Sequence, residues 1–183
     1  MGLFLFISGC SDNTHKQGVG IVLSKRIKNT LISYIPVSNR VITARLHSQQ
    51  INISVIVGYA LTNEATDSDN DDFYLQLSET FDGLPRHDIK LLLGDFNAKI
   101  TNDNSARSGI IGQHSLHVSS TDNGTRLLDF CAIRQVTVGG TLFQHKDIHK
   151  GTWKSPDGRT VNQIDHSICI STKWSHSLLD VRS

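Results

Sequence analysis

Short apolar runs separated by polar, turn-rich segments dominate the first half of the chain. The clearest lies at residues 51–59, where every second residue is apolar or aromatic, as in a β-strand that commits one face to a core. Runs at residues 19–23 and 41–46 predict two further strands. Residues 89–93 form a nearly continuous apolar run, which predicts a strand buried on both faces. The pattern indicates a protein built around a sheet.

Two segments have the periodicity of helices. Residues 64–72 contain five acidic residues and no basic one, followed by apolar residues at helical spacing up to Phe81. Acidic side chains stabilise the positive amino end of a helix, so they need no metal to explain them. A second helix is predicted at residues 122–135, and short strands at residues 136–138 and 163–170.

The amino-terminal apolar run at residues 3–7, followed by Ser8, Gly9 and Cys10, superficially resembles a bacterial lipoprotein signal. No Lys or Arg precedes it, and it is shorter than the roughly 7 to 15 residues of a signal h-region, so a strand is the preferred interpretation. No stretch approaches the roughly 20 apolar residues of a membrane span, and no membrane partner is expected.

Composition adds broad limits. Of the 183 residues, 38% are hydrophobic and 19% charged, so residues 1–183 are expected to form a single domain with its own core. A net charge of +1 gives no general attraction for nucleic acid, so any such binding must come from a local patch. Three widely separated cysteines favour a reducing, intracellular compartment.

The tetrapeptide Gly94-Asp95-Phe96-Asn97 follows the central apolar strand. Ligands often bind at such strand ends, and strand alternation predicts Asp95 and Asn97 on one side. A carboxylate that holds or deprotonates water, beside an amide that donates to a developing negative oxygen, suits attack on a phosphate or ester. The alternative is a simple turn. Tyr59 ends its own strand, so it lies near Asp95 if the two strands are neighbours; otherwise it is a rim aromatic.

Residues 145–159 form the one locally basic segment, with four basic residues against two acidic ones. Lysine and arginine interleaved with Thr152 and Trp153 suit phosphate contacts, although a solvated loop explains the segment equally well. His145 and His149 have a spacing found in helical zinc sites, but glycines flank them and no third ligand is evident, so zinc is not expected.

Motifs in a fixed order carry a family resemblance. They are Tyr59 at a strand end, Gly94-Asp95-Phe96-Asn97, Thr152-Trp153, and Asn162-Gln163-Ile164-Asp165-His166. Together they resemble the endonuclease/exonuclease/phosphatase superfamily. The segments at residues 140–146, 155–160 and 177–182 are more specific, and resemble the endonuclease domain of LINE-type retrotransposons and the craniofacial development protein 2-like sequences derived from them.

The resemblance implies a DNase I-like fold, a four-layer α/β sandwich with two mixed β-sheets packed face to face. It also implies hydrolysis of DNA phosphodiester bonds with Mg²⁺ or Mn²⁺ as cofactor and DNA as partner, and a nuclear location if the retrotransposon role is retained. No obligate protein partner is implied.

Residue roles follow from the same resemblance. Asp95 would orient or deprotonate the attacking water and contribute partially to metal binding, Asn97 would position that water, and Tyr59 would contact the phosphate. Asp165 would hold the imidazole of a catalytic histidine. The residues expected against the DNA backbone are Tyr59, Thr152, Lys150, Lys154 and Arg159. We expect Tyr59, Asp95, Asn97, Thr152 and Asp165 to converge at one rim of the sandwich.

The chain also departs from the family pattern. The family's catalytic histidine lies in a Ser-Asp-His motif beyond the segment matching residues 178–182, and its metal-binding glutamate and a further asparagine lie before the segment matching residue 6, so the fold is expected to be incomplete at both termini. His166 is expected to point away from Asp165 and not to replace the missing histidine. Two hypotheses remain: a metal-dependent endonuclease with little activity, or a non-catalytic remnant that binds nucleic acid or protein weakly.

Overall fold

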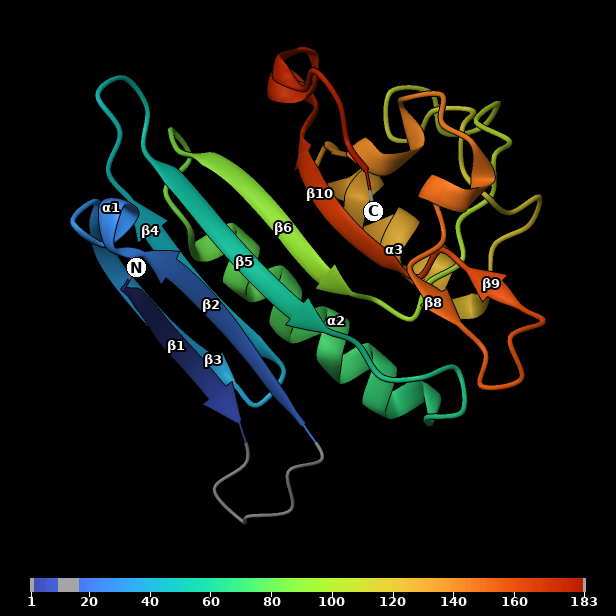
Figure 1. The fold of residues 1–183 in the computed structure, drawn as a ribbon, viewed down its shortest axis with the longest axis horizontal. Coiled ribbons are helices and arrows are strands. Elements are labelled where there is room, and N and C mark those ends of the chain that lie inside the picture. Colours follow the sequence, from blue (N-terminus) through green and yellow to red (C-terminus); the bar gives the residue numbers. More distant parts are fainter. Residues whose placement is uncertain (1, 10–16, 183) are drawn as a thin grey trace.

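A six-stranded mixed sheet forms the centre of the computed structural model, which describes residues 2–9 and 17–182 (Figure 1). Its strands lie in the order β3-β4-β5-β6-β10-β7. The bounds are Leu31–Ser38 for β3, Val41–Leu46 for β4, Ile53–Tyr59 for β5, Ile89–Asp95 for β6, Val136–Val138 for β7 and Asp165–Ser171 for β10. Strands β5 and β6 pair in parallel, and the other neighbours pair antiparallel. The predicted α/β class is confirmed.

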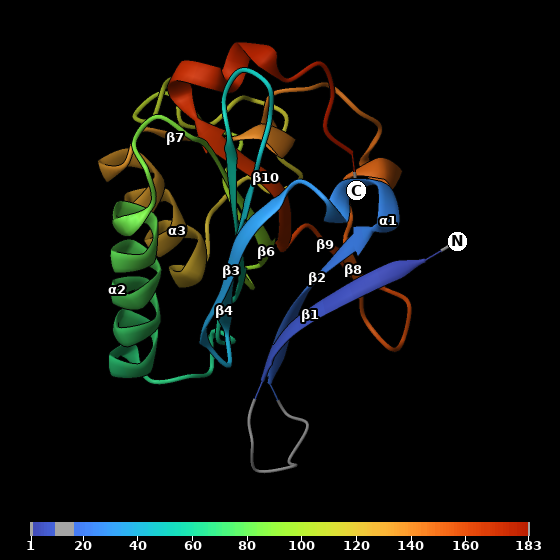
Figure 2. The same ribbon diagram turned by 90° about the vertical axis from the view of Figure 1, so that its left-hand side faces the viewer.

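Two helices, α2 (Asp67–Gly83) and α3 (Asp122–Ile133), cover one face of this sheet (Figure 2). Helix α2 begins where Thr66 caps it, accepting a hydrogen bond from the Asp69 N–H at 3.2 Å. Its first turn is acidic, which agrees with the predicted capping role of these acids. Phe81 of α2 meets Phe130 of α3 edge to face, with ring centroids 5.6 Å apart, within the larger of two apolar cores.

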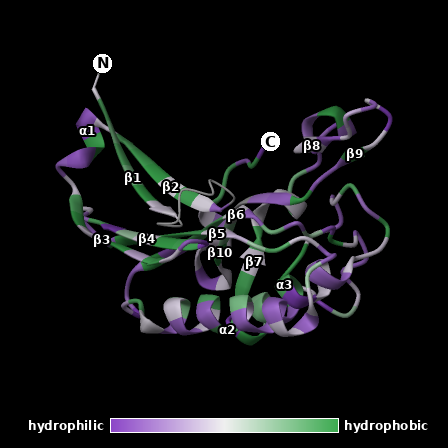
Figure 3. Ribbon diagram, turned by 90° about the horizontal axis from the view of Figure 1, so that it is seen from below, coloured by the Kyte–Doolittle hydropathy of each residue, from purple (hydrophilic) through white to green (hydrophobic). Residues whose placement is uncertain are grey.

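An antiparallel hairpin of β1 (Leu3–Gly9) and β2 (Gly18–Ser24) packs on the other face of the sheet, followed by the four-residue helix α1 (Lys25–Lys28) (Figures 2 and 3). Ile21 and Leu23 of the hairpin contact Ile42 and Ala44 in a second, smaller core. The described residues therefore pair a mixed sheet with a two-stranded antiparallel one. A second mixed sheet was expected at this position, and the structure has the two-stranded antiparallel hairpin there instead.

The predicted orientation of β5 needs a correction. Its regularly spaced apolar residues were expected to face the core, yet the fully buried positions are the alternate ones, Ser54, Ile56 and Gly58, whereas Val57 is half-buried against the hairpin. Strand β6 was expected to be buried on both faces, but only Leu92 is fully buried. The reason is the same for both strands: two long helices shield one face, and a narrow hairpin shields the other.

Several shorter elements complete the fold. Strands β8 (Trp153–Lys154) and β9 (Val161–Asn162) form a small hairpin, and 3₁₀ turns lie at Gly139–Thr141 (η1), Asp147–His149 (η2) and Thr172–Ser177 (η3). Residues 101–120 form a long loop, with no helix or strand longer than an isolated bridge. In the described part of the chain, no helix is both long and apolar enough to cross a membrane.

Candidate active site

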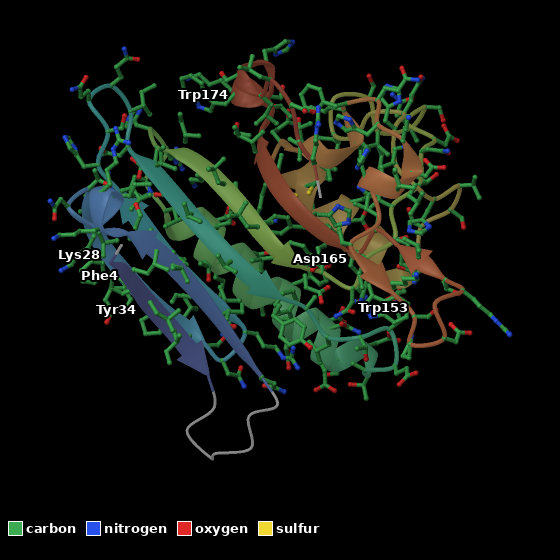
Figure 4. All side chains as sticks on the ribbon, in the orientation of Figure 1. Phe4, Lys28, Tyr34, Trp153, Asp165 and Trp174 are labelled. Carbon is green, nitrogen blue, oxygen red and sulfur yellow. The ribbon has the colours of Figure 1, made fainter. Side chains whose placement is uncertain are left out.

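Three strand ends bring three candidate residues side by side. Parallel pairing of β5 with β6 sets Tyr59 opposite Asp95, and antiparallel pairing of β6 with β10 sets Asp165 opposite Asp95. Residues directly opposite each other in a sheet project their side chains to the same face. The β8–β9 hairpin lies at this end of the sheet, and Trp153 and Asp165 lie near each other there (Figures 1 and 4).

The turn after β6 is held by its own polar groups. Asp95 Oδ1 accepts a hydrogen bond from the Asn97 backbone N–H at 2.9 Å, and Asn97 Nδ2 donates to the Ala60 carbonyl at 3.1 Å. Asn97 has a left-handed φ of 47°, a conformation that asparagine tolerates better than most residues. The tetrapeptide therefore makes a turn and also presents Asp95 and Asn97 to the same pocket, so the two interpretations of the motif are compatible.

An open pocket of about 610 Å³ lies at these strand ends. It is lined by Tyr59, Thr62, Asn63, Glu64, Asp95, Asn97, Lys99, Trp153, Asn162 and Ile164. Glu64 and Lys99 were not among the predicted site residues. Each follows a strand end by four or five residues, which is the one feature of the sequence that points to them.

Burial raises the pKa of Asp95, the Asn97 N–H opposes that rise, and the nearby Asp165 carboxylate adds to it. Two carboxylates on neighbouring strand ends repel each other, and a cation close to both would relieve that repulsion. Mg²⁺ is commonly held by only one or two carboxylates while it keeps several waters, so Asp95 and Asp165 fit such an ion. No cluster of three or more His, Cys, Asp or Glu suited to a metal occurs in the described ranges.

Thr152 holds the start of β10. Its Oγ1 accepts hydrogen bonds from the backbone N–H groups of Ile164 and Asp165, each at 3.1 Å. The hydroxyl thus fixes the backbone beneath Asp165. Contact between Thr152 and a DNA backbone remains a prediction.

Asp165 also borders a small cavity of about 10 Å³, room for about one water molecule, together with His145, His149 and Lys150. His145 Nε2 lies 2.7 Å from Asp180 Oδ1, so this imidazole is paired with another carboxylate. Among the residues described, no side chain hydrogen-bonds the Asp165 carboxylate. The expected imidazole partner of Asp165 is not found in this part of the chain.

His166 is buried, with Nε2 2.9 Å from the Ala98 carbonyl. Burial lowers its pKa, which favours the neutral imidazole. This contact with a main-chain carbonyl agrees with the expectation that His166 does not act as the imidazole partner of Asp165.

The basic segment divides into two parts. Lys154 and Arg159 belong to the β8–β9 hairpin, and the Arg159 side chain is 87% exposed. Lys150 is 12% exposed and donates to Asp147 at 3.2 Å. Trp153 is 42% exposed on the pocket wall. An exposed hairpin with two cations and an aromatic ring therefore stands beside Asp95, whereas Lys150 lies in the cavity behind Asp165.

The chain is similar to curated sequences along nearly its whole length. No protein-family model matches the chain. Craniofacial development protein 2 from Tragulus javanicus and from Bos taurus is 32% identical over 179 residues, which is 97% of this chain and 30% of each relative. The chain therefore spans about a third of the length of the curated relatives it matches.

Solved structures give the fold. AP endonuclease LMAP from Leishmania major has a TM-score of 0.66 at 10% identity, over 98% of this chain and 65% of that one. The chain has the endonuclease/exonuclease/phosphatase fold. The endonuclease domain of TRAS1, a telomere-specific non-LTR retrotransposon, has a TM-score of 0.57 at 14% identity, over 94% of this chain and 66% of that one. An endonuclease/exonuclease/phosphatase family protein from Leptotrichia buccalis C-1013-b has a TM-score of 0.57 at 12% identity, over 92% and 59%.

Proposed function

We propose that this chain is the catalytic part of a metal-dependent endonuclease of retrotransposon origin, which hydrolyses phosphodiester bonds in DNA. The observation that carries the proposal is the strand register that sets Tyr59, Asp95 and Asp165 side by side at one end of the sheet. Tyr59 and Asp95 line the open pocket of about 610 Å³, and Asp165 lies opposite Asp95 in the strand register.

Each side chain has a role consistent with its position. Asp95, held by the Asn97 N–H, accepts a proton from the attacking water, and Asn97 and Tyr59 donate hydrogen bonds to phosphate oxygens. A divalent cation, held by Asp95 with Asp165 close by, would neutralise charge on the phosphate. The oxygen-only donor set suits Mg²⁺ or Mn²⁺.

DNA would approach over the β8–β9 hairpin. Lys154 and Arg159 are exposed there for contacts with phosphates, which supply most sequence-independent affinity. Trp153 offers an aromatic face at the pocket wall. A net charge of +1 means that this local patch, and not a general field, supplies the attraction.

The rate should be low. The Asp165 carboxylate has no imidazole partner in the described structure, and an acid–base group contributes about 10²- to 10⁴-fold in rate. The same observation favours the second candidate function, a non-catalytic domain that binds nucleic acid through the β8–β9 hairpin.

Nicking of supercoiled plasmid with Mg²⁺ or Mn²⁺ tests the proposal. Asp95→Asn should abolish nicking, whereas Asp72→Asn, the same change on an exposed position of α2, should leave it intact. Nicking that survives Asp95→Asn would contradict the assignment. Absence of nicking, together with DNA binding that Lys154→Gln and Arg159→Gln weaken, would favour the binding domain instead.

A further inference from the structure

A second pocket lies at the far end of the sheet from Asp95. It occupies about 200 Å³ between the end of α2, the start of β6 and the 3₁₀ turn η3. Lys90 stands five residues before Asp95 on β6, a separation of roughly 17 Å along a strand. Trp174, at this pocket, is at the opposite end of β10 from Asp165 (Figure 4). The pocket is therefore separate from the candidate active site.

Basic side chains dominate its lining. Arg86, Lys90, Arg134 and Lys173 all border the pocket, with Asp88 as its one acidic residue. These cations come from three separate parts of the chain, which the fold gathers around one hollow.

The acidic groups nearby are already engaged. Asp88 accepts hydrogen bonds from Arg45 Nε at 2.7 Å and from Ser54 Oγ at 2.7 Å, and the Asp82 carboxylate lies 2.8 Å from Arg134. In contrast, Arg86, Lys90 and Lys173 form no salt bridge with a carboxylate in the described ranges. The pocket therefore has more positive charge than its own acids neutralise.

The positions of two lysines suit an anion. Lys90 Nζ donates to the Phe81 carbonyl at 2.7 Å and lies 4.6 Å from the Phe81 ring centroid. Lys173 Nζ lies 5.3 Å from the centroid of the Trp174 ring, which forms part of the pocket wall. Aromatic rings thus position both ammonium groups at the pocket.

A buried donor without a hydrogen-bond partner also favours a bound anion. Arg134 Nε is buried and has no hydrogen-bond partner among the described residues. Burial lowers the pKa of Lys90, Asp82 and Asp88 oppose that effect, and Arg86 adds to it. A bound anion would accept a hydrogen bond from Arg134 Nε. It would also raise the pKa of Lys90, because a nearby negative charge favours the charged ammonium.

We propose that this pocket binds a phosphate group, carried by a nucleic-acid strand or by a free nucleotide. Guanidinium and ammonium groups together suit a group with several charged oxygens. A volume of about 200 Å³ is below the roughly 300 to 1,000 Å³ of sites that enclose a whole small molecule, so the phosphate enters and the rest of the ligand stays outside. The proposal does not depend on nuclease activity.

The intrinsic fluorescence of Trp174 provides the test. The chain has two tryptophans, so a Trp153→Phe background leaves Trp174 as the reporter. We would titrate this protein with inorganic phosphate, a nucleoside monophosphate and single-stranded oligothymidylate, in low salt with chelator to prevent cleavage. Each ligand that binds should change the emission saturably. Preference for the oligonucleotide would identify a nucleic-acid strand as the source, and equal binding of the small phosphates would identify free nucleotides.

Two variants in this background decide the outcome. Arg86→Gln and Lys173→Gln should each weaken binding roughly tenfold, whereas Lys28→Gln, on the distant helix α1, should not change it. Asp95→Asn should also leave the titration unchanged, which separates this pocket from the proposed nuclease site. Circular dichroism would confirm that each variant is folded. A flat titration for all three ligands, or equal affinity in folded Arg86→Gln, Lys173→Gln and Lys28→Gln proteins, would overturn the proposal.

Discussion

At the scale of single residues, Asp88 is the clearest test of a polar group in the core. It is 6% exposed and accepts hydrogen bonds from Arg45 and Ser54. Asp88→Ala should lower the free energy of unfolding by about 2 kcal/mol, because it strands the buried Ser54 hydroxyl and the Arg45 guanidinium. Urea denaturation measures this loss. Asp72→Ala, on an exposed position, should change stability by less than about 0.5 kcal/mol.

The pH dependence of Asp88 follows from the same contacts. The hydrogen bond from Arg45 holds the pKa of Asp88 below its usual 3.8, with burial opposing and Ser54 assisting. A carboxyl with a depressed pKa stabilises the fold fully above its unfolded-state value, and this contribution is lost as the pH falls through the folded-state pKa. The stability difference between wild type and Asp88→Ala should therefore shrink in acid below about pH 4. A difference that stays constant down to the acid transition would show that the ion pair contributes nothing.

The titration of Asp95 should depend on the charge of Asp165. Burial raises the pKa of Asp95 and the Asp165 charge adds to the rise, so Asp165→Asn should lower the pKa of Asp95. Carboxyl chemical shifts of Asp95, followed by NMR over a pH series, measure it. Asp103→Asn, on the surface loop, serves as the matched change and should leave Asp95 unaffected. An identical Asp95 titration in both variants would mean that the two carboxylates do not face each other.

Among elements, the β5–β6 pair depends on one glycine. Gly94 has a φ of +145°, and a Cβ there would lie 1.9 Å from the Gly58 carbonyl oxygen. Gly94→Ala should cost more than about 3 kcal/mol, because the strands must separate or the backbone must change. Gly83→Ala, at the end of α2 where a Cβ meets nothing within 4 Å, should alter stability by no more than about 1 kcal/mol. Thermal melting compares them, and similar melting temperatures for the two variants would contradict the close approach of β5 and β6.

The pattern of apolar and polar residues predicted those helices and strands whose apolar residues pack into a core. Strands β2, β4, β5, β6 and β7 and both long helices lie close to their predicted positions. Strand β3 was not predicted, because its residues are mostly exposed at the sheet edge and it contains Pro36, which is tolerated only at such edges or bulges. Strands β8 and β9 have two residues each, too few for any periodicity.

The candidate site shows the same limit. Asp95, Asn97 and Tyr59 were identified from motif and strand ends, but the alignment of Asp95 with Asp165 is a property of strand order. In the sheet, β10 lies between β6 and β7, and no local sequence pattern determines this strand order. Glu64 and Lys99 reach the pocket from loops. In a loop, sequence periodicity does not indicate where a side chain points.

At the scale of the whole molecule, the outer face of the β1–β2 hairpin is an exposed apolar surface. Alternation turns four apolar side chains away from the core: Leu3, Leu5, Ile7 and Val22 are 64%, 64%, 67% and 57% exposed. Figure 3 shows that much of β1 and β2 is hydrophobic in sequence. Strand β1 has one neighbour in the described structure, so its other edge presents unpaired backbone groups. Exposed apolar side chains on an unpaired edge promote association between chains.

We therefore expect the isolated chain to bind an apolar fluorescent dye and to self-associate as its concentration rises. The double variant Leu5→Thr with Ile7→Thr keeps residues that suit a strand and should suppress both effects. Leu75→Thr with Ile133→Thr removes equally exposed apolar side chains, at 59% and 76%, from the helical layer and should suppress neither. Light scattering after size exclusion, with dye fluorescence on the same samples, makes the comparison. A wild-type chain that stays monomeric and does not bind the dye would contradict the prediction directly. Equal suppression by both double variants would also contradict it, because association would then follow the total exposed apolar surface and not the hairpin face.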